Sequence, residues 1–184
     1  MPRERVVEMT VRNLLIYIPF AIVSTVLVLI AVVLSPVLAA VSVALRRDTL
    51  PFGLQWFSTV DDTLDGGQHQ HSESYPSGVT GWRLWWQRTC WIARNPAQGF
   101  QVYPLGFDAS DMLLIVNDVT GTPGEAPYCR YRVWRDPEGR RVWSWQRSIP
   151  IGGRSYVKLW FGWTVKEEIM RFSLKFVPFS LSSY

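Results

Sequence analysis

The chain has 184 residues and carries 19 Lys and Arg against 15 Asp and Glu, a net charge of +4. This length holds one small domain beside any membrane segment, and so modest a charge does not favour a nucleic-acid-binding protein. The sequence has no phosphate-binding loop, dinucleotide-binding glycine motif, G-x-S-x-G or H-E-x-x-H motif, so the common nucleotide, hydrolase and metalloprotease sites are not indicated. We therefore expect no enzyme activity, no catalytic residues and no cofactor.

An apolar run without Asp, Glu, Lys, Arg or His extends from Asn13 to Leu45. A helix of about 20 apolar residues crosses a bilayer, and Leu14 to Leu34 alone reaches that length. The sequence predicts one transmembrane helix with an interfacial extension over residues 13–47, which ends at Arg46 and Arg47.

The main alternative for this run is a cleaved signal peptide, with Ser42-Val43-Ala44 as a small-residue cleavage site. The apolar core of a signal peptide is about 7–15 residues long, so this much longer run favours an uncleaved anchor. Positive charges near its two ends are almost balanced, and the positive-inside rule hardly distinguishes the two orientations. Because Arg46 and Arg47 directly follow the span, we expect the C-terminal domain on the cytoplasmic side.

The composition divides the chain into four parts, and the expected fold class is α+β. They are a charged N-terminal tail (1–12), the transmembrane helix with its extension (13–47), an exit segment with a polar loop (48–81) and a small β-rich domain (82–184).

A second helix is predicted from Trp82 to Arg94, where Trp residues recur at helical spacing. Asn95-Pro96 ends it, because a residue that precedes proline avoids the α conformation. This Trp-rich amphipathic helix either packs its Trp face on the domain core or lies on a membrane surface, and both interpretations stay open.

Aromatic and arginine residues after the span are the candidates for contact with the membrane interface or with a partner. Trp concentrates at membrane–water interfaces, and all ten Trp lie outside the apolar run. The candidate residues are Trp56, Phe57, Trp82, Trp85, Trp86, Trp91, Arg83 and Arg88. The four Trp of the predicted helix are expected to bury one shared face.

From Gln101 onward, short runs rich in aromatic and β-branched residues alternate with Gly- and Pro-containing turns. This pattern predicts an antiparallel β-meander. The expected segments are an apolar run at 112–117 followed by strands at 128–135, 140–149, 156–165 and 172–179.

The turn at Asp136-Pro137-Glu138-Gly139 sets the expected hairpin register. If these four residues form the loop, Arg135 faces Arg140 and opposed residue numbers sum to 275. Three cation–π pairs would then line one solvent-facing side: Arg132–Trp143, Arg130–Trp145 and Trp134–Arg141. Basic and aromatic residues also line surfaces that bind single-stranded nucleic acid, but we favour the structural role.

Two further groups contain residues of the kinds used in redox or metal chemistry. Cys90 and Cys129 lack a C-x-x-C spacing; they form either one disulfide in an oxidising compartment or two reduced thiols, and a cytoplasmic domain implies thiols. The only grouping that resembles a metal site is Asp61, Asp62, Asp65, His69, His71 and Glu73. It lies in a loop without fixed spacing, so we expect a solvated loop and no metal.

Three segments, taken in order, resemble uncharacterised small single-span membrane proteins encoded by tailed phages and prophages. They are W-F-x-T-x-D at 56–61, R-N-P-x-x-G-F at 94–100, and Gly162-Trp163 ahead of Pro178-Phe179-Ser180. The resemblance implies a phage gene and a bacterial host membrane. It brings no activity and no site residues.

Together these features predict a phage- or prophage-encoded accessory protein, anchored by a single pass in the host inner membrane. Its β-rich domain would bind a protein partner or the membrane surface, in host takeover or superinfection exclusion. The alternatives are a single-span holin-like lysis protein and a virion component that contacts the host envelope. The expected partners are the lipid bilayer and an unknown protein, with no nucleic acid.

Overall fold

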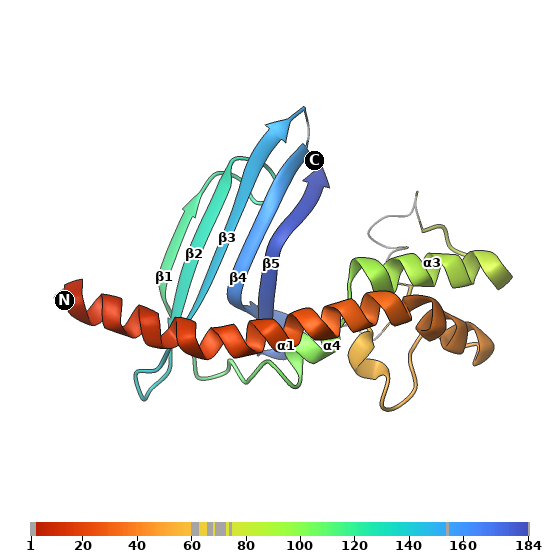
Figure 1. The fold of residues 1–184 in the computed structure, drawn as a ribbon, viewed down its shortest axis with the longest axis horizontal. Helices are drawn as coiled ribbons and strands as arrows, with labels where there is room; N and C mark the ends of the chain where they lie inside the picture. The colour runs from red at the N-terminus through yellow and green to blue at the C-terminus, as the bar shows by residue number, and fades with distance from the viewer. Residues whose placement is uncertain are drawn as a thin grey trace. The chain divides into compact units, whose positions relative to one another are not determined.

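The structure is a computed structural model that describes residues 3–59, 63–65, 68, 73, 75–153 and 155–183. It is α+β, as predicted, with one long apolar N-terminal helix and a five-stranded antiparallel sheet (Figure 1). The chain divides into two compact units: Met1–Ile22 with Gly106–Tyr184, and Val23–Leu105. The long helix contributes its first part to one unit and its second part to the other.

Helix α1 runs from Arg3 to Ala44 and so begins ten residues before the predicted apolar run. Its segment Leu14–Ala44 has a mean hydropathy of 2.8 and is long and apolar enough to cross a membrane, a criterion that signal sequences and buried core helices also meet. The helix ends in a Schellman motif, in which Arg47 N–H bonds to Ser42 O and Arg46 N–H to Val43 O. Arg46 takes the left-handed conformation that this ending requires, with φ of +52°.

The first unit is built on a β-meander, which confirms that prediction. Each strand pairs with the next in sequence, because short turns join antiparallel neighbours. The strands are β1 (Leu113–Thr120), β2 (Tyr128–Arg135), β3 (Arg141–Gly152), β4 (Ser155–Lys166) and β5 (Arg171–Ser183).

Tyr17 of α1 packs into this sheet. Its ring centroid lies 5.2 Å from those of Trp143 and Trp163, and its hydroxyl donates a 2.6 Å hydrogen bond to Lys175 O. Phe172 and Leu174 of β5 are fully buried. The start of α1 is thus fixed to the sheet by aromatic packing and a buried hydrogen bond.

The predicted β2–β3 register was wrong by one residue. Opposed residue numbers sum to 276, so Arg135 pairs with Arg141, while Arg132 lies opposite Ser144 instead of Trp143. Five residues, instead of the expected four, lie between the paired Arg135 and Arg141. Among these five, Asp136 N–H bonds to Arg140 O and closes a turn of three residues, the last of which, Gly139, takes the left-handed conformation with φ of +86°. A turn closed by a left-handed residue is the usual three-residue hairpin loop.

The predicted Arg–Trp ladder therefore does not form. Arg132 Nε donates to Asn117 Oδ1 at 2.9 Å and Arg130 Nη2 to Gln146 Oε1 at 3.2 Å. These arginines contact amides, and Trp143 instead packs on Tyr17.

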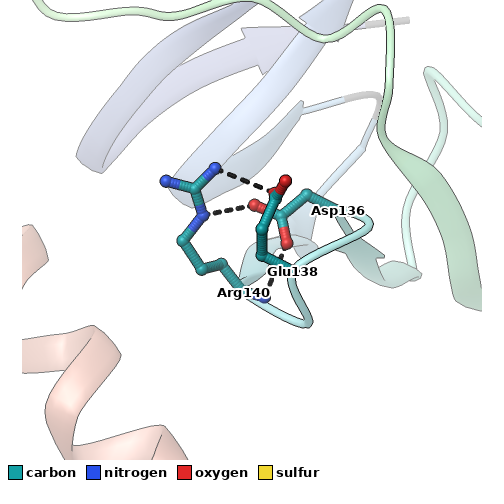
Figure 2. Close-up of polar contacts among 3 residues, drawn as sticks. All are labelled: Asp136, Glu138 and Arg140. Carbon is teal, nitrogen blue, oxygen red and sulfur yellow. Dashed lines mark hydrogen bonds and ion pairs between the residues drawn. The ribbon is translucent and has the colours of Figure 1, made fainter.

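Asp136 holds this turn together (Figure 2). Its carboxylate accepts the backbone N–H of Arg140 at 2.7 Å and pairs with Arg140 Nε, while Arg140 Nη2 reaches Glu138 Oε2 at 3.2 Å. Burial raises the pKa of Asp136, but the hydrogen bonds and charge of Arg140 outweigh burial and leave the pKa lowered.

We expect Asp136→Ala to lower the melting temperature by several degrees, because both anchors of the turn are lost. Glu138→Ala is the control, since Glu138 makes one contact at an exposed position, and it should have little effect. A carboxyl whose folded pKa is lowered stabilises above its unfolded pKa and loses that contribution as pH falls through the folded value. The difference between wild type and Asp136→Ala in thermal unfolding should therefore vanish in acid. Equal losses from both variants would contradict this role.

The second unit packs the later part of α1 with α3 (Gly81–Arg94), η1 (Gln55–Phe57) and α4 (Gln98–Val102). Helix α3 begins one residue before the predicted helix and ends at the predicted residue, Arg94. The hydrophobic core of the second unit contains Leu38, Ala39, Leu50, Leu64 and Ile92.

Candidate functional site

Over Leu14–Ala44, most of the α1 surface is apolar and exposed. A narrow stripe is buried, at spacings of three, four or seven residues that place its members on one side of the helix: Tyr17, Ala21, Ser24, Ala31, Ser35, Leu38 and Ser42, with Ala39 buried beside them. The remaining sides expose large aliphatic residues, among them Leu15, Ile22, Val26, Leu29, Val33 and Val37. So extended an apolar surface marks a site for lipid or protein contact. We call it the α1 apolar surface.

The four Trp of α3 do not bury one shared face, contrary to the prediction. Trp91 is 4% exposed, with its ring 5.5 Å from that of Tyr75, whereas Trp82 is 71% and Trp86 is 55% exposed. Nine residues advance a helix by about 900°, so Trp91 lies opposite Trp82. Trp85 is half-buried and donates its indole N–H to Pro36 O at 2.8 Å.

Trp82 and Trp86 therefore form an exposed aromatic pair on α3. The Arg83 guanidinium lies 6.0 Å from the Trp82 ring centroid. Exposed Trp beside Arg suits contact with a membrane interface or a partner.

Arg88 is buried, whereas sequence analysis placed it among the surface candidates. Its Nη1 donates to Ser42 Oγ at 3.1 Å and to Arg47 O at 2.5 Å. The guanidinium thus sits at the C-terminal end of α1, where the helix dipole favours a cation. Burial lowers the pKa of Arg88, and the carboxylates of Asp48 and Asp65 oppose that shift.

We expect Arg88→Met to destabilise the second unit by about 2–3 kcal/mol, because charge-assisted hydrogen bonds to the end of α1 are lost. Arg83→Met is the matched control, since it removes an exposed arginine from the same helix. Thermal unfolding of both purified variants measures the difference. Equal stability of the two variants would exclude the capping role.

The segments W-F-x-T-x-D and R-N-P-x-x-G-F contact each other. The Phe100 ring lies 5.2 Å from that of Trp56 and 5.0 Å from that of Phe57. A Cβ on Gly99 would lie 2.7 Å from Trp56 Cα, so only glycine fits this approach. Trp56 and Phe57, predicted as interface residues, thus also have a packing role that sequence reasoning missed.

The sheet has two chemically different faces. On one, Trp145 and Phe161 stack with ring centroids 5.8 Å apart, and the same face receives Tyr17. On the other, the Lys158 and Lys175 ammonium groups lie 4.5 and 5.5 Å from the Trp160 ring centroid. We call the second side the cationic face; no sequence motif indicated it, because strand pairing assembles it.

The other predicted groups give no chemical centre. Cys90 and Cys129 are free thiols. Within the described ranges no group of three or more metal-ligating residues occurs. Asp61, Asp62, His69 and His71, from the predicted acidic and histidine cluster, lie outside the described residues. A hollow beside the β2–β3 turn is lined by Asp108, Asp111, Asp136, Glu138 and Arg140. Asp136 and Arg140 pair with each other there and stabilise the turn.

DUF7338, described as a family of unknown function, matches residues 9–182. The chain belongs to this family. The matched range contains the apolar part of α1, the whole of the second compact unit and most of the first. No curated protein and no solved structure matches the chain.

Proposed function

We propose that this member of the family DUF7338 attaches to a lipid bilayer through α1 and presents its sheet as a binding surface for a partner. The α1 apolar surface carries the proposal. It is uncharged over Leu14–Ala44, and burying apolar surface yields about 25 cal/mol per Å² removed from water. The exposed Trp82, Trp86 and Arg83 support an interfacial location, because such residues favour the headgroup layer.

The position of Tyr17 bears on how α1 enters the bilayer. No uncharged run longer than 13 residues follows Leu45, so the chain after α1 offers no second crossing segment. If α1 crossed the bilayer, Tyr17 and the sheet would lie on opposite sides. Tyr17 packs against Trp143 and Trp163 of the sheet. A helix that crossed the bilayer could not keep these contacts.

We therefore favour insertion of α1 parallel to the membrane plane, with the buried stripe toward the protein and the apolar surface in lipid. Interfacial helices bury their apolar side by about 5–10 Å in this way. The second candidate is the single-pass arrangement, favoured by the 31-residue length and high hydropathy of Leu14–Ala44; it requires Tyr17 to leave the sheet.

Epitope tags at the two ends of the full-length protein distinguish these arrangements. In sealed vesicles of one orientation, in-plane insertion places both tags on the same side, and a crossing helix places them on opposite sides. Alkaline carbonate extraction tests attachment itself. Full release of the protein by carbonate would overturn membrane insertion, and tags on opposite sides would overturn the in-plane arrangement.

The biological role stays a prediction. We propose that the protein is an accessory protein encoded by a phage or prophage and located in the bacterial inner membrane. Its sheet would bind a host or phage protein during host takeover or superinfection exclusion. Expression in a host culture with a membrane-potential dye tests the holin-like alternative. Rapid depolarisation and lysis would favour a holin, and unchanged growth would favour the accessory role.

A further inference from the structure

The cationic face lies on strands that are rich in Lys and Arg. Strands β2 to β5 contain nine Lys and Arg and no Asp or Glu. All three lysines of the protein lie in β4 and β5, and strand register places them on one side. Lys158 and Lys166 lie eight positions apart on β4, an even offset that puts both side chains on the same face. Lys175 pairs with Gly162, midway between them.

Trp160 lies at the centre of this face. Two ammonium groups lie over its ring, from Lys158 at 4.5 Å and Lys175 at 5.5 Å. Its indole N–H donates to Ser144 Oγ at 3.2 Å. Ser144 and Ser148 are buried beneath the longer side chains, so the tryptophan and lysines are held over a floor of small residues.

The positively charged groups on this face repel one another. Burial, together with the nearby charges of Lys166 and Lys158, lowers the pKa of Lys175 to about 7. Burial and the charge of Arg130 also lower the pKa of Lys158. Glu167 interacts with Arg132 at one end of the face. A bound anion would relieve this repulsion, whereas a face evolved only for solubility would not need half-buried lysines.

We propose that the cationic face binds the phosphate group of an anionic phospholipid through Arg130, Lys158 and Lys175 beside Trp160. Ammonium and guanidinium groups form charge-assisted hydrogen bonds with phosphate oxygens. The lipid source is favoured because the proposed attachment holds the protein at a bilayer, whose anionic headgroups attract clustered Lys and Arg residues. This step rests on the proposed membrane attachment.

The test uses the full-length protein in nanodiscs of neutral phosphatidylcholine, with and without phosphatidylglycerol. A ligand that binds only the folded state raises the melting temperature, so phosphatidylglycerol should stabilise the wild type. Lys158→Gln with Lys175→Gln should abolish most of that shift and weaken lipid binding by about tenfold or more. The matched control is Arg135→Gln with Arg147→Gln, which removes two exposed charges from the opposite face and should keep the shift.

Three outcomes would overturn the site: no shift with phosphatidylglycerol, equal loss in both double variants, or tighter binding of a single-stranded oligonucleotide than of the lipid. An equal shift with inorganic phosphate alone would overturn the lipid source. Flotation with neutral vesicles is read separately. Protein that floats without responding to phosphatidylglycerol contradicts only this site, whereas protein that fails to float contradicts the proposed membrane attachment.

Discussion

Replacing Leu29 and Val33 together with arginine should release the protein from membranes. Both side chains belong to the α1 apolar surface and are 61% and 75% exposed, so their replacement leaves the protein core intact. Each arginine replaces an apolar side chain in lipid by a charge, so the free energy gained from apolar burial is lost at two positions on one side of α1. Carbonate extraction and flotation with neutral vesicles measure the loss.

The matched control places the same two arginines outside α1. Leu113 and Leu181 are 67% and 63% exposed at the two edge strands of the sheet. The variant with both replaced by arginine should remain in the membrane fraction. If both double variants detach equally, attachment depends on overall charge; if neither does, the α1 apolar surface is not the anchor.

Gly162→Ala should cause the largest loss of stability from a single methyl group, roughly 3–5 kcal/mol. Gly162 has a φ of +92°, and an added Cβ would lie 2.2 Å from the carbonyl oxygen of Trp143 on the adjacent strand. The backbone of β3 would have to move, which would also displace Trp143 from Tyr17. The expected readouts are a lower melting temperature and increased protease cleavage within the sheet.

Gly124→Ala separates the clash from the backbone strain. Gly124 has nearly the same conformation, with φ of +88°, and no heavy atom within 4 Å of an added Cβ. This control should cost only the strain of the left-handed conformation, about 1–3 kcal/mol at most. Equal losses for both variants would mean that the close approach of β3 and β4 contributes nothing to stability.

The features of this protein that depend on local pattern were predictable from its amino-acid sequence. The uncharged apolar residues identified α1, the Trp spacing and Asn95-Pro96 bounded α3, and turn residues indicated the meander. These features were predictable because helix and strand periodicity and turn chemistry are encoded within a few neighbouring residues.

The sides of those elements that are buried depend on contacts between residues far apart in the sequence. Trp91 lies in the core while Trp82 is exposed, and Arg88 caps α1 through contacts to residues more than 40 positions earlier. The hairpin register depended on one left-handed glycine that adds a residue to the loop. The cationic face gathers residues from separate strands, so its existence depended on that register, since a slip of one residue exchanges the two faces of a strand.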